Sequence, residues 1–458
     1  MRYNHYLTFL DVVLVLLMYI PLLLIIGWFY ARKYKDTPLY GYFMKGLILK
    51  LICGLGFAWL YVYYYGGGDT QMYFRGATKI YNAIYDKGFE AVTMPGILDR
   101  GSASTFFTQR FAGIINLFAL DSFWACTLLF AALSFLGLWL LFLSFYRLYP
   151  HLHKLLAIVT LFIPGVVFWS SGIMKDSICM LFIGVIVYFI QNIFLLRRQL
   201  ILSALLTIAG FYVIVILKAY IALALILAIA LYALMAFKAG ITNTAVKIII
   251  MPIAAVLIVV GAALAINQIG ESLQRYSLEN LAETAQTYQN YHERTSTAGR
   301  GGSETRTGSG YTLGEIDYSN PLSIVSKLPV ALATTYFRPF IWEVSNPVML
   351  LAALESLIVM LFTIQVIRKT GLFNFFKQIF SQKEILFCFT FAVIFGFAVG
   401  FTSYNFGSLV RYKAPCVPFF LIALVLIYDL RPADKQNAEK ENMVKRIGGP
   451  YTMQQQPS

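Results

Sequence analysis

The sequence is poor in charged residues, which make up only 13% of the 458 positions. A soluble domain carries about 25%. Hydrophobic residues make up 59% of the chain, and long apolar runs recur between residues 8 and 430, so a soluble globular protein is excluded. Runs near 20 residues predict helices that cross a membrane, whereas a membrane β-barrel would show short alternating segments.

Cysteine and histidine are also scarce. The five cysteines lie in or at the ends of apolar runs without CxxC spacing, so neither a disulfide framework nor a zinc site is expected. The four histidines offer no credible Ser–His pair, which argues against a membrane protease. The sequence has no GxxxxGK[ST] phosphate-binding loop, which argues against ATP-driven transport.

The net charge of +14 comes mainly from short loops between apolar runs, so it does not indicate nucleic-acid binding. Basic loops mark the cytoplasmic side, which places the N-terminus on the extracytoplasmic side and the C-terminus in the cytoplasm. No small-residue cleavage site precedes the basic cluster "ARKYK", so the first span is expected to be uncleaved. The basic segments are 31–50, 147–154, 197–198, 238–247, 368–383 and 431–458.

The predicted fold is all-α: one polytopic transmembrane domain over residues 1–430 and a disordered cytoplasmic tail over 431–458. Large extracytoplasmic loops are expected at 66–121 and 268–344. The apolar stretches 155–196 and 200–237 are each about 40 residues long, too long for one crossing, so each is predicted to fold into a hairpin. The eleven predicted spans lie near 9–30, 46–65, 122–146, 155–171, 177–196, 200–217, 220–237, 247–267, 345–367, 385–403 and 414–430.

The stretch "YYYGGGDTQMYF", residues 63–74, puts three glycines and one carboxylate, Asp69, at the extracytoplasmic end of the second span. Apolar and polar residues after it alternate with helical spacing, which predicts an amphipathic helix lying flat on the membrane surface. The glycines allow a sharp turn and a close approach of substrate to the backbone. The alternative is a simple turn in which Asp69 caps the surface helix.

The predicted hairpin tips carry charges. "WSSGIMKDS", residues 169–177, contains Lys175 and Asp176, and the second tip contains Lys218. Asp176 could simply stabilise the start of a helix. Lys175 opposes the dipole of that helix, so an anionic ligand such as a phosphate would compensate its charge.

Two further segments place charges near the extracytoplasmic surface. "ATTYFRPFIWEVSNP", residues 333–347, contains Arg338 and Glu343, which could equally form a plain surface ion pair. "TSYNFGSLVRYKAP", residues 402–415, packs three polar candidates into one short outer tip. Because short outer loops tend to avoid lysine and arginine, these exceptions are candidates for substrate binding. The three residues of the last tip are Asn405, Arg411 and Lys413.

A carboxylate and several cations on one face suit the transfer of a group from a phosphate leaving group to a hydroxyl. Asp69 would take the hydroxyl proton or hold a metal. The cations would stabilise charge on the departing phosphate. Spacing alone does not show that these residues converge, since they are far apart in sequence.

With "GGGDTQMYFRGA" in its first extracytoplasmic loop, the chain resembles bacterial GT-C membrane glycosyltransferases, and also the polymerases of O-antigen and exopolysaccharide assembly. The resemblance implies a polyprenyl-phosphate-linked sugar donor, a glycan acceptor, inversion at the anomeric carbon and Asp69 as general base. It also implies that Arg338 and Arg411 engage the lipid phosphate. The expected location is the bacterial cytoplasmic (inner) membrane, beside polysaccharide assembly machinery.

One departure from the GT-C pattern is that Asp69 is followed by Thr70, with no second acid adjacent. We therefore assign no metal ligands, although a divalent cation such as Mg²⁺ or Mn²⁺ stays open. Two other functions stay open as well. A transporter or flippase of lipid-linked saccharide would use the same cations along a pathway, and a membrane scaffold would use its charges for topology alone.

Overall fold

The computed structural model describes residues 8–98, 101–196, 199–240 and 320–429, with residues 311, 313, 314, 316 and 317 between them. Every regular element in these residues is a helix, as predicted. The predicted span 247–267 and the tail 431–458 lie outside the described residues.

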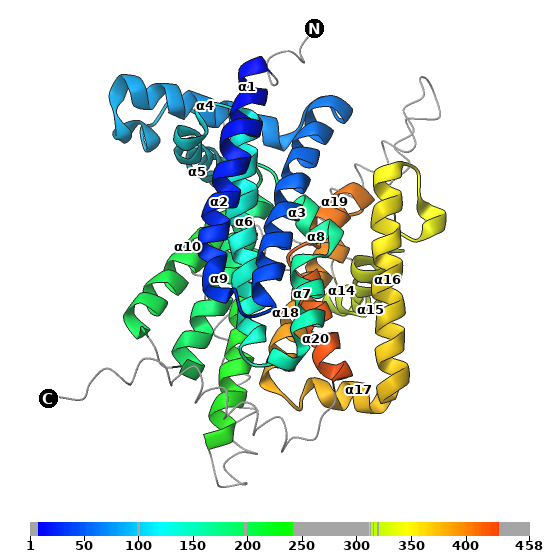
Figure 1. Cartoon of the computed structure of the whole chain (residues 1–458). Coiled ribbons are helices and arrows are strands. Elements are labelled where there is room, and N and C mark those ends of the chain that lie inside the picture. Colours follow the sequence, from blue (N-terminus) through cyan, green and yellow to red (C-terminus); the bar gives the residue numbers. More distant parts are fainter. Residues whose placement is uncertain are drawn as a thin grey trace, which may run out of the picture.

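Ten α-helices precede residue 241 and seven follow residue 320 among the described residues (Figure 1). Three π-helical turns, Leu14–Tyr19, Leu60–Tyr64 and Asn192–Leu196, join or extend them. The first group is α1 (Phe9–Val13), α2 (Ile20–Ala31), α3 (Leu39–Trp59), α4 (Asp69–Lys87), α5 (Ala103–Ala119), α6 (Phe123–Tyr146), α7 (His153–Leu161), α8 (Pro164–Trp169), α9 (Lys175–Gln191) and α10 (Leu200–Gly240). The second is α14 (Pro321–Ser326), α15 (Leu328–Phe337), α16 (Pro347–Thr370), α17 (Leu372–Ile379), α18 (Lys383–Thr402), α19 (Phe406–Tyr412) and α20 (Val417–Tyr428).

In the described part of the chain, seven helices are long and apolar enough to cross a membrane. An eighth is obtained if α19 and α20, which meet at 62°, form one bent span. The protein is therefore a polytopic helical membrane protein. The predicted span 155–171 differs from the others, because it is divided between α7 and α8, and both are short.

The helix α10 is kinked at Lys218, whose backbone leaves the helical region at φ −152° and ψ 79°. Its first half packs against α9, where Gly210 lies beside Ile186. Its second half packs against α18, where the rings of Tyr232 and Phe387 are 6.0 Å apart. Each half runs antiparallel to the helix that it packs against. Because α9 and α18 run in opposite directions, the two halves of α10 do too, as the predicted hairpin requires.

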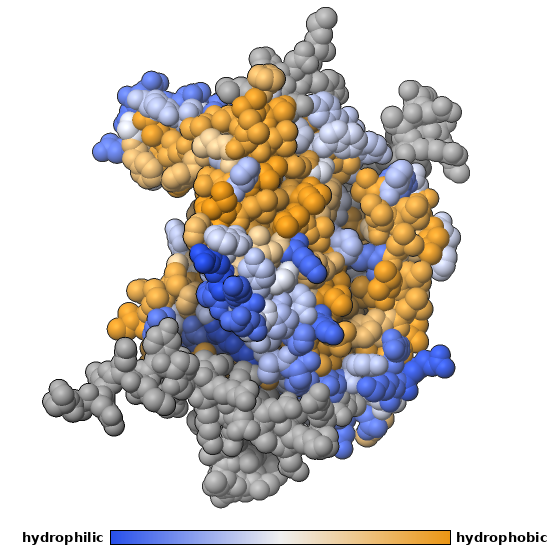
Figure 2. Space-filling view, in the orientation of Figure 1, coloured by the Kyte–Doolittle hydropathy of each residue, from blue (hydrophilic) through white to orange (hydrophobic). Residues whose placement is uncertain are grey.

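One end of the bundle brings the predicted tips together. There α3 gives way to α4, α9 begins, α10 kinks and α19 meets α20; we call it the site end. Figure 1 shows α4 running across this end at a steep angle to α2 and α3. Figure 2 shows apolar side chains over α2 and α16, with hydrophilic ones gathered where α2 and α3 meet at the opposite end.

The turn from α3 into α4 depends on glycine. Gly66 and Gly68 have positive φ angles of 67° and 139°, a region that other residues rarely adopt. A Cβ on Gly68 would lie 2.8 Å from the Tyr61 ring. After the turn, Tyr73, Ala77 and Ile80 are buried, so the predicted apolar stripe of the surface helix faces the protein.

The chain before α16 is more than a surface loop. The sequence predicts residues 268–344 as an extracytoplasmic loop, but α15, in the described part of this stretch, packs along α18. The Tyr336 hydroxyl donates to the Ala392 carbonyl at 2.7 Å, and the Thr335 hydroxyl donates to the Gly396 carbonyl at 2.7 Å. Arg338, directly after α15, is therefore held beside the bundle and not on a free loop.

Candidate functional site

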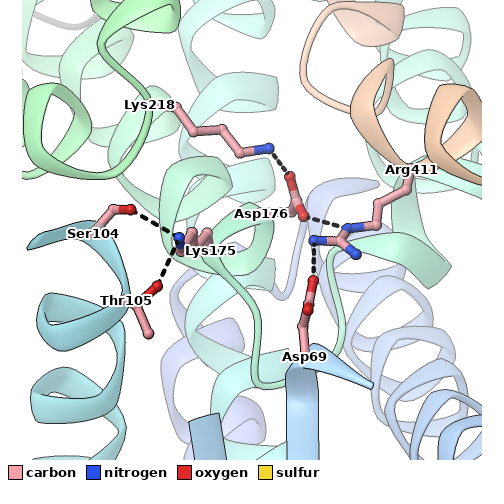
Figure 3. Close-up of polar contacts among 7 residues, drawn as sticks. All are labelled: Asp69, Ser104, Thr105, Lys175, Asp176, Lys218 and Arg411. Carbon is pink, nitrogen blue, oxygen red and sulfur yellow. Dashed lines mark hydrogen bonds and ion pairs between the residues drawn. The ribbon is translucent and has the colours of Figure 1, made fainter. Parts of the chain in front are cut away.

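Four charged side chains form a continuous chain of ion pairs at the site end (Figure 3). The Arg411 Nη2 donates to Asp69 Oδ2 at 3.1 Å, and its Nε donates to Asp176 Oδ2 at 2.9 Å. The other oxygen of Asp176 pairs with the Lys218 amine. With the adjacent Lys175, we call this set the charge cluster.

Each member of the charge cluster comes from a position where a helix starts, ends or breaks. Asp69 is the first residue of α4, and Gly68, not Asp69, occupies the N-cap. Asp176 lies in the first turn of α9 and Lys218 at the kink of α10. Arg411 lies in the last turn of α19. Both carboxylates lie in the first turn of a helix, where an acid is favourable. Both also pair with cations, which the capping interpretations did not predict.

Lys175 differs from the other cations. Its amine donates to the Ser104 hydroxyl at 2.8 Å and to the Thr105 hydroxyl at 3.4 Å (Figure 3). Within the described residues it has no carboxylate within ion-pair distance. The amine also lies 5.7 Å from the centre of the Tyr73 ring. Burial, aided by Asp69, raises the pKa of the Tyr73 phenol, so this hydroxyl stays protonated at neutral pH.

The charges in the cluster do not cancel. Three cations and two carboxylates leave one net positive charge, which favours an anionic ligand. The two acids also differ in access, because the side chain of Asp176 is 1% exposed and that of Asp69 is 49% exposed. Asp176 therefore neutralises buried cations, whereas Asp69 is accessible from outside the protein.

A cleft of about 340 Å³ opens beside Arg411. Its wall combines aromatic rings with amide and hydroxyl groups, a lining that suits a polar ring-shaped ligand. The side chain of Asn405 caps α19 by accepting from the Gly407 amide at 2.7 Å, and so helps to orient the helix that carries Arg411. The aromatic lining residues are Tyr61, Tyr65, Trp169 and Phe406, and the polar ones are Asn346, Asn405, Ser408 and Arg411.

The remaining predicted residues form a separate group. Arg338 pairs with Glu343, and its guanidinium lies 5.1 Å from the centre of the Phe406 ring. The Lys413 amine donates to the Arg338 carbonyl at 3.1 Å and to the Ser356 hydroxyl at 2.9 Å.

Of the predicted site residues in the part of the chain that the structure describes, Asn405 and Arg411 line the cleft. The others do not, namely Asp69, Lys175, Asp176, Lys218, Arg338, Glu343 and Lys413. The cleft thus brings together neither Asp69 nor Arg338, and the roles predicted for these two residues stay predictions. Glu343 neutralises Arg338 locally, and the Arg338 guanidinium lies over the ring of Phe406, a residue that lines the cleft.

Sequence reasoning missed two charged residues inside spans. Lys50 falls both in the basic segment 31–50 and in the predicted span 46–65, and only its charge enters the sequence-based prediction; in the structure it lies inside α3 and is fully buried. Glu355 lies within α16, where its carboxylate accepts from the Gly165 amide. A lone charge inside an apolar run was the available signal for both.

The donor groups of the site do not resemble a metal centre, because the described residues contain no group of three or more His, Cys, Asp or Glu side chains. Comparisons of the chain with protein-family models, curated proteins and solved structures find no match. The functional argument therefore rests on the geometry of the charge cluster and the cleft.

Proposed function

We propose that the protein is a membrane glycosyltransferase that moves a sugar from a polyprenyl-phosphate-linked donor to a hydroxyl of a glycan acceptor, in the assembly of cell-surface polysaccharide. One observation carries the proposal. An exposed carboxylate, Asp69, pairs with Arg411, which belongs to a cluster with a net positive charge and also lines a cleft with aromatic and amide groups.

The residues divide the chemistry between them. Asp69 accepts the proton of the acceptor hydroxyl while the oxygen of that hydroxyl forms the new bond to the anomeric carbon. The bond from that carbon to the phosphate oxygen breaks, and the electron pair leaves with the phosphate. Arg411 and Lys175 stabilise the charge that develops there. A single displacement of this kind inverts the configuration at the anomeric carbon.

In this proposal the chain crosses the bacterial inner membrane eleven times, with the N-terminus and the site end outside and the C-terminal tail in the cytoplasm. The distribution of basic residues supports this orientation. Arg32, Lys33 and Lys35 follow α2, and Arg368 and Lys369 end α16, all at the end opposite the charge cluster.

The test replaces Asp69 by Asn in the native host, after deletion of the chromosomal copy. Losing a general base costs about 10²- to 10⁴-fold in rate, so surface glycan should disappear while protein level and thermal stability stay unchanged. The matched control is Asp86→Asn, an exposed acid at the far end of the same helix. Normal glycan from Asp69→Asn cells would exclude Asp69 as the base.

A flippase of lipid-linked saccharide is the second candidate, because broken helices surround the charge cluster. The kink at Lys218, the division between α7 and α8, and the 62° bend between α19 and α20 resemble the discontinuous helices that line transporter sites. The location of the lipid-linked precursor in the deletion strain separates the two functions. Accumulation on the outer leaflet supports the transferase, and accumulation on the cytoplasmic leaflet supports the flippase.

A further inference from the structure

The short helix α8 is held at both ends by charged side chains from two other helices. At its start, the Glu355 carboxylate of α16 accepts from the Gly165 amide. At its end, the Lys50 amine of α3 donates to the Val167 carbonyl at 2.9 Å and to the Ser170 hydroxyl at 2.6 Å. These two residues belong to none of the ion pairs of the charge cluster.

The signs of the two charges match the needs of a helix. The first amides and last carbonyls of a helix lack partners within it, and an anion is favourable at its start and a cation at its end. A helix of six residues also has little stability of its own. Glu355 and Lys50 therefore supply what α8 cannot supply for itself.

Lys50 is an unusual group to find at this place. It is fully buried, and burying an ammonium group inside a membrane protein is costly unless it finds strong partners. Within the described residues its hydrogen bonds go to Val167 and Ser170, both at the end of α8. The stability of the buried Lys50 ammonium group therefore depends on where the end of α8 lies.

The end of α8 leads directly into the candidate site. Trp169, its last residue, lines the cleft. A turn of five residues then reaches Lys175 and Asp176. The turn is tight: the Ser177 hydroxyl donates to the Gly172 carbonyl at 2.7 Å, and a Cβ on Gly172 would collide with the Phe57 ring. Movement of α8 would therefore displace Lys175 and Asp176.

We propose that Lys50 and Glu355 are positioning residues that clamp α8, and thereby fix Trp169, Lys175 and Asp176. Neither residue is a catalytic residue, because neither is part of the cleft lining or the charge cluster. The clamp itself is a property of the fold, and only its effect on transfer rests on the proposed function.

The first experiment follows amide hydrogen exchange in peptides covering residues 164–176 of the purified protein in nanodiscs. Lys50→Met should raise exchange there at least 10-fold. Glu355→Leu should do the same, and Glu355→Gln should have a smaller effect because its amide oxygen can still accept from Gly165. The matched control is Lys45→Met, an exposed lysine on the same helix, which should leave exchange unchanged.

Lys50→Arg keeps the charge and the donors, so it should restore slow exchange. The second readout is the kinetics of transfer with donor lipid extracted from the host. Displaced Lys175 and Asp176 should lower kcat about 10-fold or more in Lys50→Met, with less change in the KM for the acceptor, and Lys50→Arg should recover most of kcat.

The outcomes separate the two proposals. Unchanged exchange in Lys50→Met and in Glu355→Leu would overturn the clamp, whatever the activity. If exchange rises in the variants but the unmodified protein transfers no sugar, the clamp is supported and the transferase function is excluded. If Lys50→Met yields no folded protein, Glu355→Leu decides, because it removes the acceptor for the Gly165 amide and exchange equal to that of the unmodified protein would overturn the clamp.

Discussion

The charge cluster and the Arg338–Glu343 pair place similar side chains in very different arrangements. Arg338 and Glu343 are five residues apart, and their charges cancel within one segment. Arg411 instead reaches an acid 342 residues away and shares a second acid with Lys218. A local pair needs no other part of the chain to neutralise its charges. A cluster built from separate helices couples those helices and keeps a surplus charge for a ligand.

The largest expected loss of stability follows from replacing Asp176, the buried acid of the charge cluster. Asp176→Ala leaves the Lys218 amine in a buried site without its carboxylate, and removing one partner of a buried pair costs about 3–5 kcal/mol. The folded yield should fall sharply, and thermal unfolding in detergent should occur at a lower temperature.

The control for this prediction removes the orphaned cation as well. Asp176→Asn combined with Lys218→Met should recover a large part of the lost stability, since no unpaired buried charge at position 218 remains. A loss below about 1 kcal/mol in Asp176→Ala would show that water or another group compensates Lys218, and the cluster would then resemble a surface pair.

Local pattern was enough to predict several parts of this arrangement. The lengths of the apolar runs predicted the membrane class, and the glycines before Asp69 predicted the turn into the amphipathic helix α4. Charges at the midpoints of overlong apolar stretches indicated the breaks at Lys175 and Lys218. Each of these signals is contained within a few turns of the chain.

Tertiary pairing was not available from the same patterns. Arg338 and Arg411 both lie in short segments near the predicted outer surface, with aromatic residues nearby, so the sequence pattern does not distinguish them. What distinguishes them is that Glu343 folds back onto Arg338, while Arg411 meets Asp69 and Asp176 across the bundle. Lys50 escaped notice because it lies where the basic segment 31–50 and the predicted span 46–65 overlap, so it was counted as a signal of topology although it lies well inside α3.

A smaller effect is expected at Lys175, the cation without a carboxylate partner in the described residues. Lys175→Met removes the surplus positive charge, so the donor concentration for half-maximal transfer should rise about 10-fold, equivalent to about 1.4 kcal/mol. Stability should change little, because the lost partners are the hydroxyls of Ser104 and Thr105. Lys87→Met, in the exposed last turn of α4, is the matched control. Equal donor dependence in both variants would remove Lys175 from the donor site.

The smallest effect is expected at the local pair, and it bears most directly on the comparison. Both side chains are partly exposed, at 20% for Arg338 and 17% for Glu343, so Glu343→Gln should cost about 1 kcal/mol or less in thermal unfolding and change transfer less than twofold. Arg338→Met should behave in the same way. If Arg338→Met instead raised the donor requirement as much as Lys175→Met, the local pair would have to open to bind phosphate. Arg338 would then belong to the donor site despite its ion pair with Glu343, and the distinction between the two regions would fail.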